Sequence, residues 1–318
     1  MSSTSIAAAF DYVGAECSTI KQHCNGLLLL DNEWPRGRAP IKEKAWVLNP
    51  ATRGWERLPP PPPICTPGME DVFDFYIEKV MRCHNHHEYY MEDHVAEREW
   101  PPSTFILLVF SSRTKRWEER PFIRQGEAAA TIGYMFDDFP CPQCYAACWL
   151  GALYVHQNGF ILRMTLSNDK YRVIELPEGF CGMYTTDLHL GKSENGVYCA
   201  LLDGHGGPRL RIWYLDETCD QINWRSKCDI NLDPLLAEFS GEHSDTYSEQ
   251  CYNRGSLLGF HPNEETVFLH TPLKRVVAYH FDSSKMEDLG CLPVEPRDHI
   301  YVSFPYTLCL MGEFSSNQ

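Results

Sequence analysis

Residues 45–56 have the sequence AWVLNPATRGWE, and residues 107–118 repeat its pattern as LLVFSSRTKRWE. Each stretch begins with apolar residues, continues into a polar turn, and places Thr, a basic residue, Trp and Glu in the same register. Polar turn residues bond their own backbone, and an aromatic residue that opens a return strand packs across the strand pair. Each stretch therefore predicts a β-hairpin.

Three looser copies of this pattern follow within residues 160–171, 210–224 and 276–286. The anchor residues that open the return strands lie 62, 54, 53 and 62 positions apart, at Trp55, Trp117, Tyr171, Trp224 and Met286. A four-stranded propeller repeat takes about 40–50 residues. The spacing predicts an all-β fold, a single β-propeller of kelch-like type with five visible copies and five or six blades. A β-sandwich is the alternative, but a sandwich does not require repeats in register.

Sequence patterns also predict the limits of this domain. We expect the propeller to span residues 20–312, after a lead-in at 1–19 and before a disordered tail at 313–318. The apolar run 301–311 predicts a strand that pairs near residues 27–30 and closes the ring, because closure removes exposed sheet edges. Residues 232–239 predict a short helix, with Asp233 as its cap and Pro234 in its first turn.

Charge and cysteine content narrow the class of protein. Among 318 residues, 43 are acidic and 28 are basic, which gives a net charge of −15. Nucleic acid and anionic membranes select for positive surfaces, so we expect neither as a partner. The N-terminus lacks a signal-peptide pattern. The 14 cysteines form no framework, and we expect those in apolar runs, such as Cys199, to be buried in a protein of the cytosol or nucleus.

Two motifs point to a family. Residues 24–29 (CNGLLL) and 48–61 (LNPATRGWERLPPP) together resemble the start of the F-box-associated, kelch-like domain of plant F-box proteins. Residues 100–103 (WPPS), 109–120 (VFSSRTKRWEER), 149–156 (WLGALYVH), 166–171 (LSNDKY) and 188–193 (LHLGKS) resemble the grass branch of that family. The resemblance covers residues 20–311.

The resemblance implies the substrate-recognition part of an SCF-type ubiquitin ligase subunit. Such subunits also carry a helical F-box of about forty residues that binds the ligase adaptor, and residues 1–21 do not show its pattern. We therefore expect a non-catalytic propeller that binds a protein substrate of unknown identity and does not bind the adaptor. A propeller-fold enzyme acting on a carbohydrate and a stand-alone scaffold protein are the alternatives.

Motifs for catalysis, cofactors and metals are incomplete. The Cys83–His94 stretch is rich in His and Glu but lacks the His-Glu-x-x-His pattern, and Cys141 and Cys144 have no second pair. Residues 191–193 (GKS) lack the first glycine of a phosphate loop, and residues 204–207 (GHGG) have no Gly-x-Ser-x-Gly partner. The proline run 59–63 predicts a connector between blades. We therefore predict no catalytic, cofactor-binding or metal-ligating residue.

The candidate binding residues lie in a long insertion. Residues 81–100 exceed the length that a hairpin connection needs, and long loops are usually functional or disordered. Aromatic side chains dominate the energetics of protein interfaces. We therefore predict partner binding by Tyr89, Tyr90 and Trp100, with a mobile insertion as the alternative.

Overall fold

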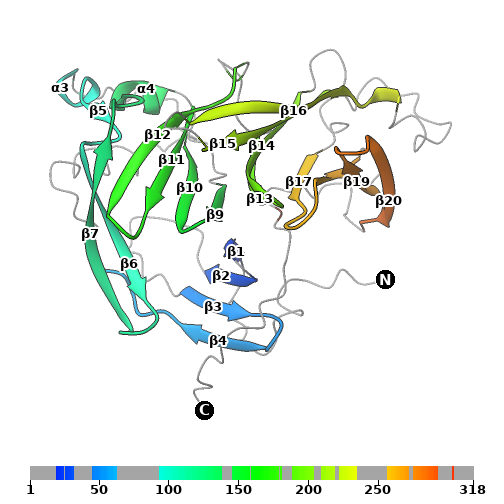
Figure 1. The fold of residues 1–318 in the computed structure, drawn as a ribbon. Coiled ribbons are helices and arrows are strands. Elements are labelled where there is room, and N and C mark those ends of the chain that lie inside the picture. Colours follow the sequence, from blue (N-terminus) through cyan, green and yellow to red (C-terminus); the bar gives the residue numbers. More distant parts are fainter. Residues whose placement is uncertain are drawn as a thin grey trace, which may run out of the picture. The chain divides into compact units, whose positions relative to one another are not determined.

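The structure is a computed structural model of the chain, and most of the residues that it describes lie in β-strands (Figure 1). It describes residues 19–24, 26–31, 45–62, 93–137, 145–157, 159–178, 180, 188–203, 209–218, 222–234, 256–271, 275–292 and 303. The chain forms two compact units, the first with residues 1–140, 162–173 and 306–318, the second with residues 141–161 and 174–305. Each unit is described by itself below.

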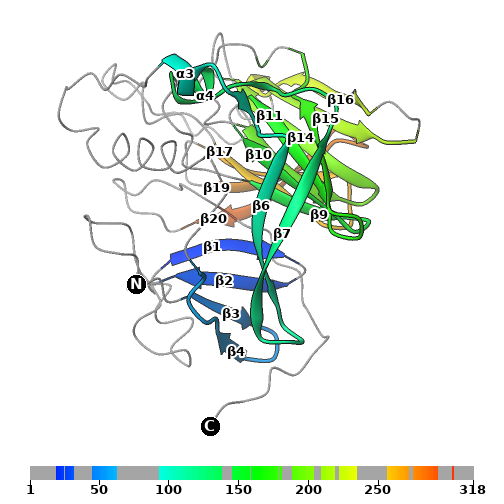
Figure 2. The same cartoon turned by 90° about the vertical axis from the view of Figure 1, so that its left-hand side faces the viewer.

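A four-stranded antiparallel meander begins the first unit (Figure 2). Its strands follow one another in the order of the chain: β1 (Thr19–Cys24), β2 (Leu27–Asp31), β3 (Ala45–Asn49) and β4 (Gly54–Arg57). Alternate residues of β2 and β3 are buried and form a small core of Leu28, Leu30, Trp46 and Leu48. A meander of four antiparallel strands is the blade of a β-propeller, so the predicted all-β, propeller-type architecture is confirmed at the level of the blade.

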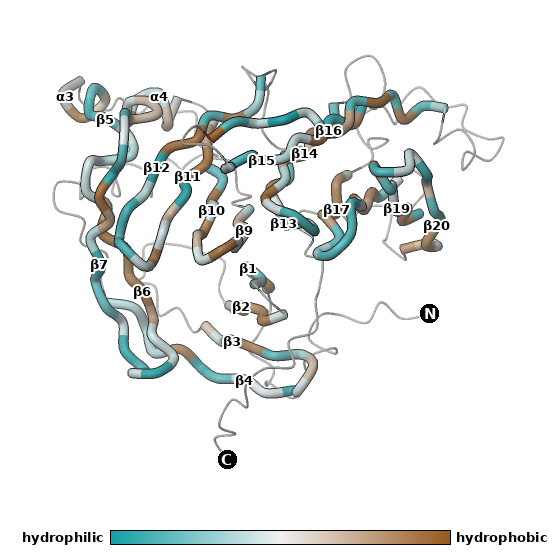
Figure 3. Tube along the Cα trace, viewed as in Figure 1, coloured by the Kyte–Doolittle hydropathy of each residue, from teal (hydrophilic) through white to brown (hydrophobic). Residues whose placement is uncertain are grey.

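The second repeat forms a long hairpin of β6 (Thr104–Ser111) and β7 (Arg116–Gln125). In Figure 3 β6 is largely hydrophobic and β7 largely hydrophilic, as their sequences require. The end of β7 extends past β6 and pairs in parallel with β12 (Lys170–Glu175), which lies beside β11 (Phe160–Thr165). The second and third copies therefore share a sheet, which differs from the expectation of one blade for each copy. The reason is the length of β7.

Short elements surround the end of this hairpin. They are α3 (Asp93–Ala96), β5 (Glu99–Trp100), β8 (Ala130–Thr131) and α4 (Ile132–Asp137). β5 pairs antiparallel with β8, so the insertion before β6 is joined to the segment that follows β7.

The second unit holds a hairpin and two more complete meanders. The hairpin consists of β9 (Ala146–Trp149) and β10 (Ala152–Gln157). The first meander runs through β13 (Leu188–Ser193), β14 (Gly196–Asp203), β15 (Arg209–Asp216) and β16 (Asn223–Asn231). The second runs through β17 (Ser256–Phe260), β18 (Thr266–His270), β19 (Arg275–His280) and β20 (Lys285–Cys291).

The predicted hairpins are confirmed, and their turns share one geometry. The anchor that opens the return strand pairs with the penultimate residue of the preceding strand, as in Leu48–Trp55, Phe110–Trp117, Leu215–Trp224 and Tyr279–Met286. Two positions before the anchor, four of the five copies have a residue with positive φ: Arg53, Lys115, Asp169 and Ser284. This repeated left-handed residue reverses the chain in the same way each time.

Two hydrophobic clusters form the core of the second unit. One packs side chains of β14, β15, β18 and β19 around Tyr198, and the other packs side chains of β9, β10, β13 and β14 around Tyr154. Cys199 is fully buried in the second cluster, as predicted from its apolar surroundings. No helix in the described part of the chain is long and apolar enough to span a membrane.

Two further expectations concern the closing strand 301–311 and the helix 232–239. The meander β1–β4 does not lack a strand, because β1 fills the position that residues 301–311 were expected to take. Of those residues only Ser303 is described, and its hydroxyl donates a hydrogen bond to the Leu258 carbonyl at 2.6 Å. At the start of the expected helix 232–239, the backbone N–H of Asp233 donates a hydrogen bond to the Asn231 side chain at 2.9 Å. The backbone N–H groups that Asp233 was expected to cap lie outside the described residues, so that cap stays a prediction. Residues 235–239 lie outside the described residues.

Candidate partner-binding site

Of the three predicted binding residues, only Trp100 lies within the described part of the chain. It is the last residue of β5, and its side chain is half-buried. Tyr89 and Tyr90 lie outside the described residues. The predicted grouping of the three aromatic side chains therefore stays a prediction.

Trp100 begins a row of aromatic rings in the first unit. Its ring meets Phe105 edge-on, with centroids 6.1 Å apart, and Phe105 meets Tyr171 at 6.5 Å. The Tyr171 hydroxyl donates a hydrogen bond to the Pro102 carbonyl. Burial raises the pKa of Tyr171 to about 12, although the positive charge of Arg124 opposes the shift. The phenol therefore stays a neutral donor at physiological pH and holds the backbone next to Trp100.

Arg124 holds the same segment from β7. Its guanidinium donates to the Pro101 carbonyl and to a Glu99 carboxylate oxygen, each at 2.5 Å, and its Nε donates to the Gly126 carbonyl at 3.2 Å. Only 8% of the Arg124 side chain is exposed. Charge-assisted bonds from a buried guanidinium are stronger than neutral ones, so β5 has a defined position on β7.

The indole Nε1 of Trp100 is buried and makes no hydrogen bond to any described residue. A buried donor without a partner costs about 1–3 kcal/mol, so Trp100 is held mainly by ring contacts and by its neighbours in sequence.

Next to β5, helix α4 presents an aromatic side chain to solvent. Ile132 and Met135 are buried on one side of the helix, whereas Tyr134 is 67% exposed. The helix is fixed at its start, because Ile132 N donates to the Arg98 carbonyl at 2.9 Å and Tyr134 N donates to the Thr131 hydroxyl at 3.3 Å. A rigid, exposed tyrosine is a typical interface anchor because it loses little conformational entropy on binding.

Sequence reasoning missed Tyr134. The stretch 131–137 (TIGYMFD) has no repeat, no strong period and no charge pattern. The only local signal is Thr131, which caps a helix that buries every third residue. We use the name α4 face for Tyr134 together with the β5 strand that lies beside the helix.

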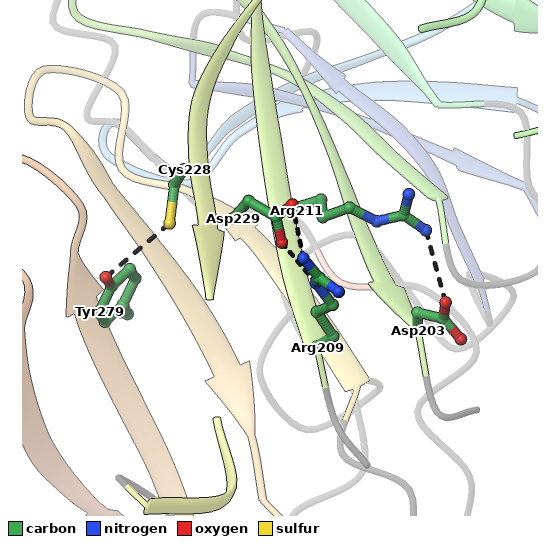
Figure 4. A network of polar contacts seen from close by, with 6 residues as sticks. All are labelled: Asp203, Arg209, Arg211, Cys228, Asp229 and Tyr279. Carbon is green, nitrogen blue, oxygen red and sulfur yellow. Dashed lines mark hydrogen bonds and ion pairs between the residues drawn. The ribbon is translucent and has the colours of Figure 1, made fainter. Parts of the chain in front are cut away.

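A second group of polar side chains lies on β14, β15 and β16 in the second unit (Figure 4). Arg209 binds both carboxylate oxygens of Asp229, at 2.5 and 2.9 Å, and Arg211 approaches Asp203 at 3.4 Å. The four charges cancel in pairs. The Arg209–Asp229 pair is exposed, so water screens it, whereas the Arg211 and Asp203 side chains are mostly buried. We interpret the network as a structural feature of this sheet.

The motifs that the sequence analysis set aside have structural roles where they are described. Gly191 and Ser193 lie in β13, and the Ser193 hydroxyl donates to the backbone carbonyls of His261 and Glu264. Pro59 accepts a hydrogen bond from Trp117, which agrees with a connector role. The described residues contain no group of three metal-ligating side chains. Most of the Cys83–His94 stretch, Cys141, Cys144 and residues 204–207 lie outside the described residues.

Comparisons with known proteins place the chain in no family. No family model matches it, and no curated protein matches it. Two solved structures of AztD from Citrobacter koseri, one in its apo form, are 14% and 13% identical to the chain. They cover 87% and 86% of this chain and 72% of their own length, each with a TM-score of 0.32.

Proposed function

We propose that the chain is a non-catalytic, protein-binding domain of propeller type that serves as the substrate-recognition part of an SCF-type ubiquitin ligase subunit. The residue patterns of the plant F-box-associated, kelch-like family support the proposal, as do three complete four-stranded meanders among the described residues. The closed kelch-like ring and a cytosolic or nuclear location are part of it.

The observation that carries the proposal is the exposure of Tyr134 on α4, a helix whose position is fixed by three kinds of contact. Burial of Ile132 and Met135, the Thr131 cap and the β5–β8 pair all hold the helix in place. The domain itself gains little from an aromatic ring that is 67% in water. A protein partner gains about 1–3 kcal/mol by burying a ring of this size, which is the range of an interface hot spot.

A crosslinking experiment tests this surface in the full chain. A photoreactive phenylalanine analogue replaces Tyr134 in one variant and Leu289, an exposed residue of β20, in a matched control. After irradiation in the native tissue we expect discrete adducts from position 134, and more of them when the proteasome is inhibited. Equal adduct patterns from both positions would contradict the proposal.

The ligase role needs its own test. We propose that residues 1–318 alone do not bind the ligase adaptor, because residues 1–21 lack the F-box pattern. Purified chain and purified adaptor are mixed and separated by size-exclusion chromatography, with an F-box protein as the positive control. Co-elution at equal amounts would show that another part of this chain binds the adaptor.

A further inference from the structure

Three turns of the second unit are joined side by side. The first, 149–152, links β9 to β10, the second, 193–196, links β13 to β14, and the third, 261–265, links β17 to β18. The Lys192 ammonium lies 5.5 Å above the Trp149 ring and connects the first turn with the second. The Ser193 hydroxyl donates to the carbonyls of His261 and Glu264, at 3.0 and 2.6 Å, and connects the second with the third. We call these three turns the turn surface.

Close packing keeps the turn surface rigid. A Cβ added at Gly191 in β13 would lie 2.8 Å from the Phe260 ring at the end of β17. The two strands therefore approach as closely as a glycine allows. A surface that is held in one conformation binds a partner at lower entropic cost than a mobile one.

Leu150 stands at the tip of the first turn, between Trp149 and Gly151. Its side chain is 86% exposed, and its φ of 45° lies in the left-handed region that a leucine rarely adopts. Gly151 follows with φ of 75°, and Trp149 pairs with Ala152, so this is a two-residue hairpin turn with positive φ at both positions. Asn-Gly is preferred in such turns, and the chain has Asn25-Gly26 between β1 and β2.

A leucine held in the left-handed region at the tip of a turn is a backbone outlier of the kind that gathers at ligand-binding sites. We propose that Leu150 is the apolar anchor of a docking site on the turn surface. The site takes a protein segment in which Lys or Arg residues flank an apolar side chain. The apolar side chain packs against Leu150 and Trp149, and the basic residues approach the carboxylates of Glu194 and Glu264.

Charge decides between the possible occupants. Glu194 and Glu264 are exposed on the second and third turns, and the whole chain carries a net charge of −15. This charge repels a second copy of the chain and an anionic lipid surface, and it attracts a basic segment. Lys192 places one positive charge over Trp149 on this surface, and Lys227 pairs with Glu265 of the third turn at 2.5 Å. Glu194 and Glu264 are the exposed carboxylates left to meet a basic segment.

This inference rests on the proposed function in one respect, since both require a protein partner, and it names a different surface and the chemistry of the partner. The probe is a library of random peptides displayed on phage, selected on the full chain. Enriched peptides are synthesised and titrated against the full chain by fluorescence anisotropy. We expect the enriched sequences to place Lys or Arg on both sides of Leu, Ile, Phe or Trp.

The variants of the anchor keep the turn intact. Leu150→Asn removes the apolar side chain and suits the positive φ, so we expect an unchanged or higher melting temperature. We expect the dissociation constant to rise about tenfold or more, as for a hot-spot residue. Leu150→Gly serves as a second variant if Leu150→Asn does not fold. Leu289→Asn removes an exposed leucine from β20 and should leave the affinity unchanged.

The charge variants test the second half of the site. Glu194→Gln with Glu264→Gln should weaken binding and make it less sensitive to salt, because screening acts only on charges that are present. Enriched peptides without basic residues would show that charge does not select the partner, and so would an affinity that is unchanged in the Glu194→Gln, Glu264→Gln variant. Either result would overturn the proposal. Failure to enrich any peptide would also overturn the proposal.

Further outcomes distinguish a peptide on the turn surface from other occupants of that surface and from binding at the α4 face. A dimer in sedimentation that Leu150→Asn dissociates, or binding to neutral lipid vesicles that requires Leu150, would assign the anchor to another occupant and overturn the proposal. Peptides whose binding depends on Tyr134 and not on Leu150 would support the α4 face alone. Peptides that depend on Leu150 and not on Tyr134 would support the turn surface alone.

Discussion

The indole Nε1 of Trp117 donates a hydrogen bond to the carbonyl oxygen of Pro59 at 2.9 Å. Trp117 opens the return strand of the second repeat, and Pro59 lies two residues after the return strand of the first. In the second unit the Trp224 indole donates in the same way to the carbonyl of Glu175, at 2.8 Å. Trp224 belongs to the fourth repeat, and Glu175 ends the return strand of the third. Each tryptophan therefore binds the carbonyl that ends, or closely follows, the return strand of the repeat before it.

This relationship gives the anchor tryptophans two separable functions. The ring packs within its own hairpin, as Trp117 does against Phe110 with centroids 5.3 Å apart. The indole N–H binds the preceding repeat. We predict that Trp117→Phe keeps the ring contact and lowers the free energy of unfolding by about 1 kcal/mol, the net contribution of one hydrogen bond. Trp224→Phe should cost a similar amount, and urea denaturation measures both.

Trp117→Ala is the reference for that experiment. It removes the ring and the donor together, so it should cost clearly more than Trp117→Phe, although the half-buried site places it toward the lower end of the range of about 3–5 kcal/mol for buried aromatic residues. If the two variants were equally stable, the ring would contribute nothing and the anchor would act only through its N–H.

A second prediction concerns the close approach of β13 and β17. Gly191→Ala places a methyl group 2.8 Å from Phe260 and should destabilise the protein by about 1–3 kcal/mol through overpacking. Gly196→Ala is the matched control, because its added Cβ would lie 3.8 Å from Tyr214, an ordinary contact distance. Thermal melting should show a clear loss for the first variant and a small change for the second. Equal melting temperatures would mean that Phe260 moves aside freely.

Asp216 at the end of β15 should contribute to the pH dependence of stability. Hydrogen bonds from the Thr218 hydroxyl and backbone N–H, together with Arg225 at 2.5 Å, lower the pKa of Asp216 to about 2. The same carboxyl titrates near about 3.9 in the unfolded chain. Its stabilising effect is therefore complete above about pH 4 and is lost as the pH falls toward about 2.

The variant Asp216→Asn tests this assignment. It should be less stable than the wild type at pH 6, and the difference should shrink as the pH approaches 2. Asp282→Asn, on the exposed turn before β20, controls for the loss of one negative charge. A stability difference between Asp216→Asn and wild type that stays constant from pH 6 to pH 2 would rule out a depressed pKa at Asp216.

Thiol reactivity should separate the cysteines by burial. Burial raises the pKa of the Cys199 thiol and also that of Cys228, whereas Cys291 at the end of β20 is exposed. Because the thiolate is the reactive form, iodoacetamide should label Cys291 in the native protein at the rate of an accessible thiol. Cys199 should be labelled only when the protein opens. Peptide mass spectrometry over time measures each rate, and rapid native labelling of Cys199 would contradict its burial.

Part of the fold could be predicted from local sequence. The turn 50–53 and its equivalents reverse the chain through polar residues, in four of five copies with a left-handed position. The anchor that follows is Trp or Tyr in four copies and Met286 in the fifth, and it lies in the same hairpin. All of these contacts join residues fewer than ten positions apart. For that reason five hairpins, their anchors and the burial of Cys199 were predictable from composition and spacing.

The arrangement of the hairpins into sheets could not be predicted in this way. The parallel pairing of Lys170 with Ile123 and the bond from Trp117 to Pro59 join residues 47 and 58 positions apart. Nothing in either local sequence encodes its distant partner. In the meander β1–β4, the place of β1 beside β2 also depends on the pairing of whole strands.

The candidate sites likewise combine properties that are local in the sequence with properties that depend on tertiary packing. The sequence by itself determined that the chain consists of β-hairpin repeats with aromatic anchors and an acidic surface, because alternation, turn residues and charge are local properties. Only the tertiary structure decided that Tyr134 is exposed while Ile132 is buried, and that Leu150, Glu194 and Glu264 belong to one surface. Exposure and proximity depend on what packs against a residue, and those neighbours are distant in the sequence.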